Sequence, residues 1–243
     1  MSARPDKLRV AAVGDIHVHE NSSEAIQQVV GQVSHNADVL ALCGDLTHLG
    51  LPEEAERLAK DLRDCRIPVV AVLGNHDYQS GRVEEVKKIL KAAKVTLLEE
   101  SETFELNGVG FAGGKGFGGG FDKHMLTPFG EDAIKRFVTE AVNESLKLEV
   151  ALQSLRTDRV VVILHYAPIA ATVIGEPPEI FPFLGSSRLA ETIDHFDVSA
   201  IFHGHAHHGT YEGMTTKGTP VYNCCYQLMQ RVCPERSYAL VEV

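Results

Sequence analysis

Five apolar segments of the sequence each end in residues that carry oxygen or nitrogen donors. The segments and their endings are VAAV with GDIH, VLALC with GDL, VVAVL with GNHD, VVVIL with HYAP, and SAIF with HGHAH. These endings supply Asp15, His17, Asp45, Asn75, His76, His165, His203 and His205. Carboxylates, an amide oxygen and imidazoles suit manganese, iron or zinc, and are poor ligands for copper(I) or iron–sulfur clusters. Two carboxylates, one amide oxygen and four imidazoles make seven ligands, more than one tetrahedral metal needs, and two metal ions sharing a bridging carboxylate would use them all.

The spacing inside these motifs indicates which side chains converge. Side chains two residues apart in an extended chain point to the same side, so Asp15 and His17 can reach one place. The same argument applies to His203 and His205. Asn75 and its neighbour His76 must diverge, which would let the asparagine hold metal while the histidine faces a substrate.

The elements that carry these motifs read as buried parallel strands. Residues 8–13, 39–43 and 69–73 are continuously apolar, as expected of strands covered on both faces. Stretches with helical spacing, 22–34 and 52–64, separate them. This alternation predicts a parallel sheet with right-handed crossovers. The carboxyl ends of such strands line one edge, which is the usual position of a ligand crevice.

The second half of the chain predicts a further sheet and two irregular segments. Asn107-Gly108 indicates a hairpin, residues 131–155 a long helix, and 160–164 another buried strand, followed by a short helix and several strands. We therefore predict an α/β fold, with two packed mixed β-sheets flanked by helices in a single domain, 1–243. Residues 113–130 and 174–185 are rich in Gly, Pro and Phe. We expect them to be loop insertions that form a flexible lid, a subunit contact or plain surface.

Composition limits the partners and the compartment. The 243 residues carry a net charge of −10, which disfavours non-specific nucleic-acid binding. No apolar run approaches the roughly 18 residues of a membrane span, and no signal peptide is evident, so we expect a cytoplasmic protein. The cysteines are odd in number and lack paired C-x-x-C spacing, which predicts buried or idle thiols rather than disulfides or a zinc site. They are Cys43, Cys65, Cys224, Cys225 and Cys233.

The order of the motifs resembles the calcineurin-like binuclear metallophosphoesterase superfamily. The matching segments are GDIH (14–17), GDLT (44–47), GNHD (74–77), His165 and GHAH (204–207). The resemblance runs from residue 14 to residue 207 and implies that family's αββα sandwich. Each motif alone is weak, and their order makes the match specific. The last motif assigns His205 and His207 as ligands, and His203, one residue before it, is set aside. The argument from i, i+2 spacing then applies to His205 and His207 instead.

The resemblance implies two divalent or trivalent metal ions, with manganese, iron and zinc the best candidates. One ion would be held by Asp15, His17, His207 and a bridging Asp45; the other by Asp45, Asn75, His165 and His205. His76 resembles the family's substrate-facing catalytic histidine, and Asp77 is its expected orienting partner. Such a site predicts hydrolysis of a phosphate ester through attack by a metal-bridging hydroxide.

The sequence around the motifs narrows the substrate class. GDLTHLG and GNHD depart from the GDxVDRG and GNHE of serine/threonine protein phosphatases. They are more similar to the cyclic-nucleotide and related diesterase branch, apart from Leu49, where those enzymes often have arginine. We expect a phosphodiesterase acting on a small phosphorylated substrate, with a small-molecule phosphomonoesterase or a nucleotide pyrophosphohydrolase as the alternative. A non-enzymatic scaffold of the same fold is a third hypothesis, which the intact ligand positions disfavour.

Overall fold

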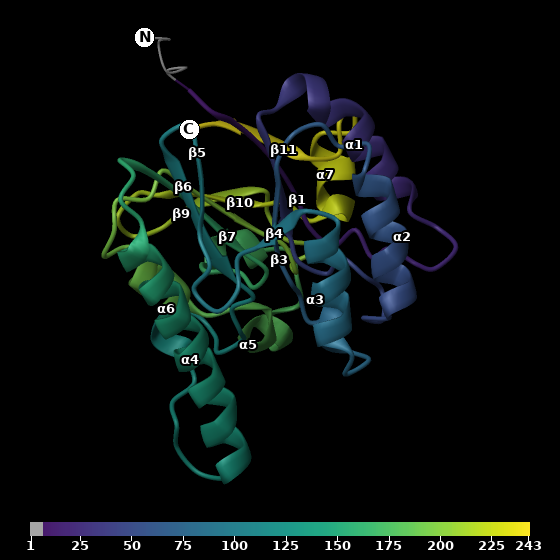
Figure 1. Ribbon diagram of the computed structural model, residues 1–243. Coiled ribbons are helices and arrows are strands. Elements are labelled where there is room, and N and C mark those ends of the chain that lie inside the picture. Colours follow the sequence, from purple (N-terminus) through teal and green to yellow (C-terminus); the bar gives the residue numbers. More distant parts are fainter. Residues whose placement is uncertain (1–6) are drawn as a thin grey trace.

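The protein is a sandwich of two β-sheets with helices on both outer faces (Figure 1). The computed structural model describes residues 7–243, so the first six residues of the predicted domain lie outside it. The first sheet has the order β11-β1-β2-β3-β4, and the second has the order β5-β6-β7-β8-β10-β9. This architecture confirms the predicted fold class.

The strands of the first sheet are β1 (Arg9–Val13), β2 (Val39–Cys43), β3 (Val69–Val72), β4 (Val95–Leu97) and β11 (Ala239–Glu242). Those of the second are β5 (Phe104–Leu106), β6 (Val109–Gly114), β7 (Arg159–Leu164), β8 (Ala200–His203), β9 (Glu212–Met214) and β10 (Pro220–Asn223). Parallel pairs join β1 through β4, and β6, β7, β8 and β10, while β11, β5 and β9 pair antiparallel at the edges. The carboxyl ends of the parallel strands in each sheet therefore point the same way.

Helices cover the outer face of each sheet. On the first sheet lie α1 (Glu24–Asn36), α2 (Pro52–Leu62) and α3 (Val83–Ala92), and on the second lie α4 (Asp132–Ser154) and α6 (Ser187–Ile193). Successive side chains of one strand point to opposite faces of the sheet and pack in different hydrophobic cores. In β2, Leu40 packs under the helices, whereas Val39 and Ala41 pack between the sheets. Burial on both faces explains why these strands are continuously apolar.

Three features differ from the expectations drawn from sequence. The segment after β10 forms a helix, α7 (Tyr226–Val232), that was not predicted. The last strand, β11, does not join the second sheet with the other strands of the second half of the chain; it pairs with β1 in the first sheet. The two Gly/Pro/Phe-rich segments are bonded to each other, Gly119 N–H to Pro182 O at 2.7 Å and Gly120 N–H to Gly185 O at 2.9 Å. Residues 118–121 are buried, so this part is a packed support and the expected flexible lid or surface loop is wrong there.

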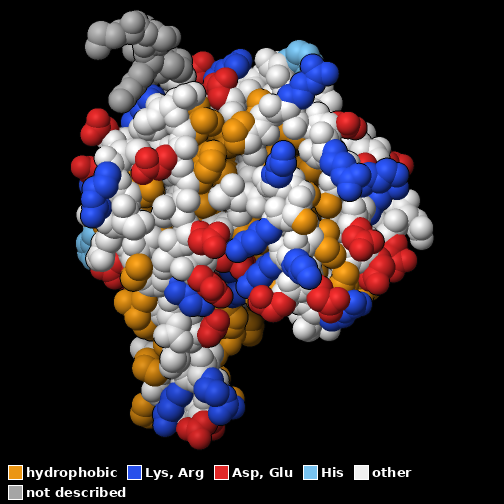
Figure 2. Space-filling view, in the orientation of Figure 1, with side chains coloured by type: hydrophobic (Ala, Val, Ile, Leu, Met, Phe, Trp, Pro, Cys, Tyr) orange, Lys and Arg blue, Asp and Glu red, His pale blue; other side chains and the backbone are white. Residues whose placement is uncertain are grey.

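The amino-terminal end of α4 and the loop before it project from the body (Figures 1 and 2). Hydrophobic side chains lie along this projection, including Phe129, which is 85% exposed, and Ile134. Acidic and basic side chains are interspersed on the face shown in Figure 2. Within residues 7–243, no helix has the length and apolar character needed to cross a membrane.

Candidate metal centre

The seven predicted metal ligands lie together beyond the carboxyl ends of β1, β2, β3, β7 and β8. Six of them form two clusters, and within each cluster the donor atoms lie within 4.8 Å of one another. One cluster is Asp15, His17 and His207, and the other is Asp45, His165 and His205. Asp45 links them, because its Oδ2 lies 4.0 Å from His17 Nε2 and its Oδ1 lies 3.4 Å from His165 Nε2. The seventh residue, Asn75, places its side-chain oxygen 3.0 Å from His165 Nε2. Each cluster contains residues that the family resemblance assigns to one of the two ions.

The backbone at these positions is turned, not extended. Asp15, His17, Asp45 and His205 have φ values of 56°, 41°, 49° and 71°, a left-handed region that costs energy for residues other than glycine. The side chains of Asp15 and His17 converge through these turns after β1 ends. His205 and His207 separate, one toward His165 and the other toward Asp15. The predicted convergence of Asp15 and His17 therefore occurs for a different reason, and the convergence predicted for His205 and His207 is wrong.

Glycines before the ligands allow the motifs to pack against one another. A Cβ on Gly44, whose φ is +81°, would lie 2.6 Å from Cγ of the His165 ring. A Cβ on Gly74 would overlap the Asp45 carboxylate. No side chain fits at either position, so each glycine lets a neighbouring motif approach to ligand distance.

The hydrogen bonds of His165 leave a space that suits a cation. Its Nδ1 lies 3.0 Å from the carbonyl oxygen of Cys43, and a carbonyl only accepts, so Nδ1 carries the hydrogen of the neutral ring. Burial lowers the pKa of His165, which keeps the ring neutral. The Nε2 lone pair then faces the side-chain oxygens of Asp45 and Asn75, and a hydrogen between these three acceptors can come only from a protonated Asp45. A metal cation among them would take the place of that proton.

His205 is fixed in the opposite tautomer. Its Nε2 lies 3.1 Å from the carbonyl oxygen of Phe183, in α5 (Phe181–Leu184), so Nε2 donates and the lone pair is on Nδ1. Burial lowers the pKa of His205 to about 3 and that of His17 to about 4. Both rings are thus neutral at physiological pH, which is the form that binds a metal ion.

The carboxylates also require positive charge. Burial, reinforced by nearby Asp15 and Asp77, raises the pKa of Asp45 to about 8. Burial alone would raise the pKa of Asp15 as well, but the bond from His207 and the proximity of His165 outweigh it and lower the pKa. Buried charges of this kind are normally paired or bound to metal. The donor set and the tautomers fit a pair of metal cations, whose positive charge would offset the burial and the carboxylate repulsion that raise the pKa of Asp45.

His76 lies beside this centre and is held by a backbone group. Its Nε2 is 3.9 Å from Asp45 Oδ2, and its Nδ1 is 2.6 Å from the carbonyl oxygen of His48. The rings of His17 and His48 flank it, at centroid distances of 4.5 and 5.9 Å. The sequence motif gave no sign of the His48 carbonyl, because a backbone oxygen is present at every residue.

Asp77 makes different contacts from those expected of an orienting partner for His76. Its buried carboxylate accepts hydrogen bonds from the backbone N–H groups of Leu46, Thr47 and Gly74, at 3.2, 2.8 and 2.8 Å, and from the Thr47 hydroxyl at 2.5 Å. Asp77 therefore ties the loop after β2 to the loop after β3. The predicted orienting role passes to the His48 carbonyl oxygen.

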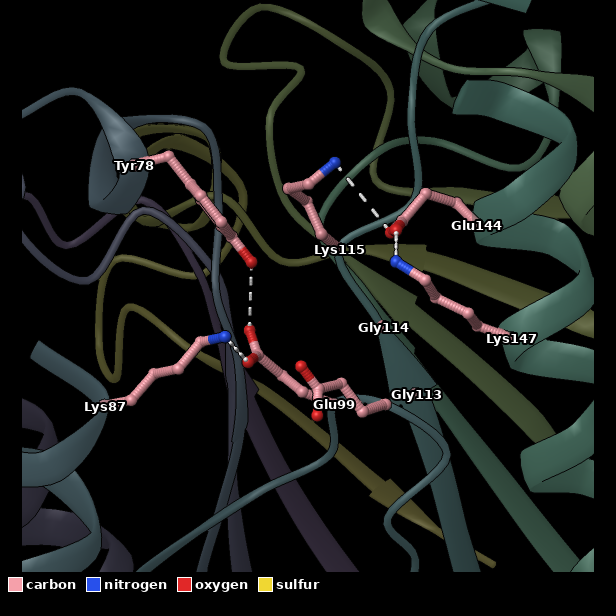
Figure 3. A pocket seen from close by; sticks show the side chains of 9 residues that line it. Tyr78, Lys87, Glu99, Gly113, Gly114, Lys115, Glu144 and Lys147 are labelled. Carbon is pink, nitrogen blue, oxygen red and sulfur yellow. Dashed lines mark hydrogen bonds and ion pairs between the residues drawn. The ribbon is translucent and has the colours of Figure 1, made fainter. Parts of the chain in front are cut away.

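A separate pocket of about 60 Å³ is lined by Tyr78, which follows the GNHD motif, and by Lys115 (Figure 3). Two ion pairs line it: Lys87 with Glu99 at 2.8 Å, and Lys147 with Glu144 at 2.7 Å. Lys115 lies over the ring of Phe117 and 3.8 Å from Glu144, and its backbone oxygen accepts the N–H groups of His165 and the next residue. Glu144 thus links Lys115 to Lys147, and none of the seven candidate ligands lines the pocket.

Comparison with known proteins places this geometry in a family. A family model described as calcineurin-like phosphoesterase matches residues 8–209. The chain belongs to the calcineurin-like phosphoesterase family. It is accordingly a hydrolase acting on phosphate ester bonds, in a family that depends on a binuclear metal centre.

Individual relatives are distant in sequence. A probable cyclic nucleotide phosphodiesterase from Vesicomyosocius okutanii subsp. Calyptogena okutanii (strain HA) is 23% identical over 204 residues, 80% of this chain and 76% of that protein. The phosphopantetheinyl hydrolase of Mycobacterium tuberculosis has a similar structure, with a TM-score of 0.72, 14% identity and coverage of 97% and 96%. A purple acid phosphatase from yellow lupin gives a TM-score of 0.55 at 12% identity, over 85% of this chain and 38% of that one. These structural likenesses concern the fold.

Proposed function

We propose that this protein is a metal-dependent phosphodiesterase with a small phosphorylated substrate. The observation that carries the proposal is the pair of donor clusters joined by Asp45, with His76 Nε2 3.9 Å from the same carboxylate. The distant relative described as a probable cyclic nucleotide phosphodiesterase supports the same substrate class.

The proposal gives each candidate ligand a role. Asp15, His17 and His207 would hold one cation, and Asn75, His165 and His205 the other, with Asp45 between them. When bound, the two cations would stabilise charge on the reacting phosphate and activate a water molecule as the nucleophile. Burial keeps the imidazoles of His17, His165 and His205 neutral, and the carbonyl oxygens of Cys43 and Phe183 fix the tautomers of the last two.

His76 would act on the leaving oxygen. Because the His48 carbonyl fixes a hydrogen on Nδ1, the proton that His76 gains and loses is on Nε2, the nitrogen nearest Asp45. Protonating the leaving oxygen from this atom is general acid catalysis, which typically contributes about 10²- to 10⁴-fold.

The surroundings of His76 favour a diester over a monoester. A diester carries one negative charge at neutral pH and a monoester close to two. The side chains next to His76 are the imidazoles of His17 and His48, and burial lowers the pKa of both. These neutral imidazoles suit the singly charged diester better, since they offer no positive charge to balance the second negative charge of a monoester.

Parallel assays with manganese test the proposal. We expect kcat/KM for bis-p-nitrophenyl phosphate to exceed that for p-nitrophenyl phosphate. A preference for the monoester would support the alternative of a phosphomonoesterase, and selective cleavage of a nucleoside triphosphate would support a pyrophosphohydrolase. Binding of metal without hydrolysis of any of the three would favour a non-enzymatic scaffold.

A further inference from the structure

The two oxygens of the Asp15 carboxylate have different surroundings. Oδ1 lies 3.0 Å from His207 Nε2, on the side of the candidate metal centre. Oδ2 accepts the thiol of Cys225 at 2.9 Å, and the backbone N–H of His205 is shared between the two oxygens, 2.9 Å from Oδ2 and 3.1 Å from Oδ1. Asp15 and Cys225 are fully buried, so solvent water has no access to these bonds.

The backbone around Cys225 is anchored to both loops that meet at Asp15. Residue 225 forms a β-bridge with Gly14, directly before Asp15. Its backbone N–H donates to the side-chain oxygen of Asn223 at 3.2 Å, and the amide nitrogen of Asn223 donates to the Ala206 carbonyl at 2.7 Å. The thiol is thereby held at a fixed place relative to the carboxylate and to the histidine loop.

We propose that Cys225 is a positioning residue for the metal centre: its thiol holds Oδ2 of Asp15 and leaves Oδ1 as the ligand atom for the first cation. The inference rests on the proposed metal centre and adds a residue outside the seven ligands. A carboxylate free to rotate must be ordered when the metal binds, whereas one held by two donors is already oriented. Groups that hold ligands in this way typically contribute about 10- to 100-fold in metal affinity.

The neighbouring cysteine provides a matched control. Cys224 is also fully buried, but its thiol lies 3.5 Å from the carbonyl oxygen of Tyr222 and makes no hydrogen bond to Asp15. A cysteine that only fills space behaves as a small hydrophobic residue. Removing either sulfur should then weaken packing alike, and only loss of the Cys225 thiol should weaken metal binding.

The experiment measures manganese binding by equilibrium dialysis of metal-free wild-type protein and of Cys225→Ala, Cys225→Ser and Cys224→Ala. We expect the first manganese ion to bind about 10- to 100-fold more weakly to Cys225→Ala. Serine keeps a hydrogen-bond donor, so Cys225→Ser should return most of the lost affinity. Cys224→Ala should bind like the wild type, although its metal-free form melts at a lower temperature.

Three results would overturn the inference. One is wild-type manganese affinity in Cys225→Ala. Another is manganese affinity that falls equally in Cys225→Ala and Cys225→Ser, or equally in Cys225→Ala and Cys224→Ala. In either case the hydrogen bond donated by the Cys225 thiol would not be responsible for the weaker binding. The third is absence of manganese binding by the wild type, which alone among these results would also refute the proposed metal centre.

Discussion

Replacing Asp77 separates a structural role from a catalytic one. In Asp77→Ala, the backbone N–H groups of Leu46, Thr47 and Gly74 lose their acceptor inside the protein. Each buried donor left without a partner costs about 1–3 kcal/mol. Because such costs are not additive among neighbours, we expect the free energy of unfolding to fall by about 3–5 kcal/mol. That is a large part of the about 5–15 kcal/mol that stabilises a typical domain.

The assay is urea unfolding of the metal-free protein, followed by far-ultraviolet circular dichroism because the chain has no tryptophan. Asp77→Asn should also destabilise. Its amide keeps one acceptor for Thr47, but its NH₂ group would face the N–H donors of Leu46 and Gly74, which Oδ2 now accepts. His76→Ala is the contrast: the ring is partly exposed and makes one hydrogen bond, so its loss should cost no more than about 1.5 kcal/mol.

The result that would refute this reasoning is an Asp77→Ala protein that unfolds within about 0.5 kcal/mol of the wild type and yet loses about 10²-fold or more in turnover. Asp77 would then act on the reaction through His76, as the sequence had suggested, and its bonds to the two loops would be dispensable.

Three further predictions concern the same centre. His76→Ala should retain metal and lose about 10²- to 10⁴-fold in turnover, whereas Asp45→Ala should lose metal too; equal metal loss, measured by elemental analysis, would contradict this division of roles. The raised pKa of Asp45, about 8 against an ordinary 3.8, means the folded metal-free protein keeps a proton that the unfolded chain has released. The free energy of unfolding of the metal-free protein should therefore fall as pH rises from about 6.5 to 8, by up to about 1.4 kcal/mol per pH unit. Added manganese should remove this decline, as measured by thermal scans across the range. A metal-free protein that gains stability over this pH range would contradict the raised pKa of Asp45. Gly74→Ala should displace Asp45 and weaken metal binding, while Gly31→Ala in α1, where a Cβ meets no atom within 4 Å, should stabilise the fold slightly; similar metal affinity in both variants, by dialysis, would count against the close packing described for Gly74.

The sequence predicted the strands and the cluster of polar residues at their ends because both leave local signals. Strands covered on both faces are continuously apolar, and the polar residues directly after them stand out. The α/β sandwich and the clustering of Asp15, Asp45 and His165 follow from these two patterns and the parallel connection of the strands.

The features that the sequence did not reveal depend on backbone atoms and on distant pairing. The carbonyl oxygens of His48 and Phe183 set the tautomers of two histidines, and a carbonyl has no side-chain signature. The thiol of Cys225 meets Asp15 only because β10 and α7 return to the end of β1, 210 residues along the chain. The left-handed turns at the ligands depend on the same tertiary packing, so local spacing suggested extended chain instead.

Anomalous diffraction from crystals grown with manganese tests the central claim most directly. Two peaks about 3.5–4 Å apart are expected, one beside Asp15, His17 and His207 and the other beside Asn75, His165 and His205, with Asp45 contacting both. A single peak, or peaks away from these side chains, would contradict the account.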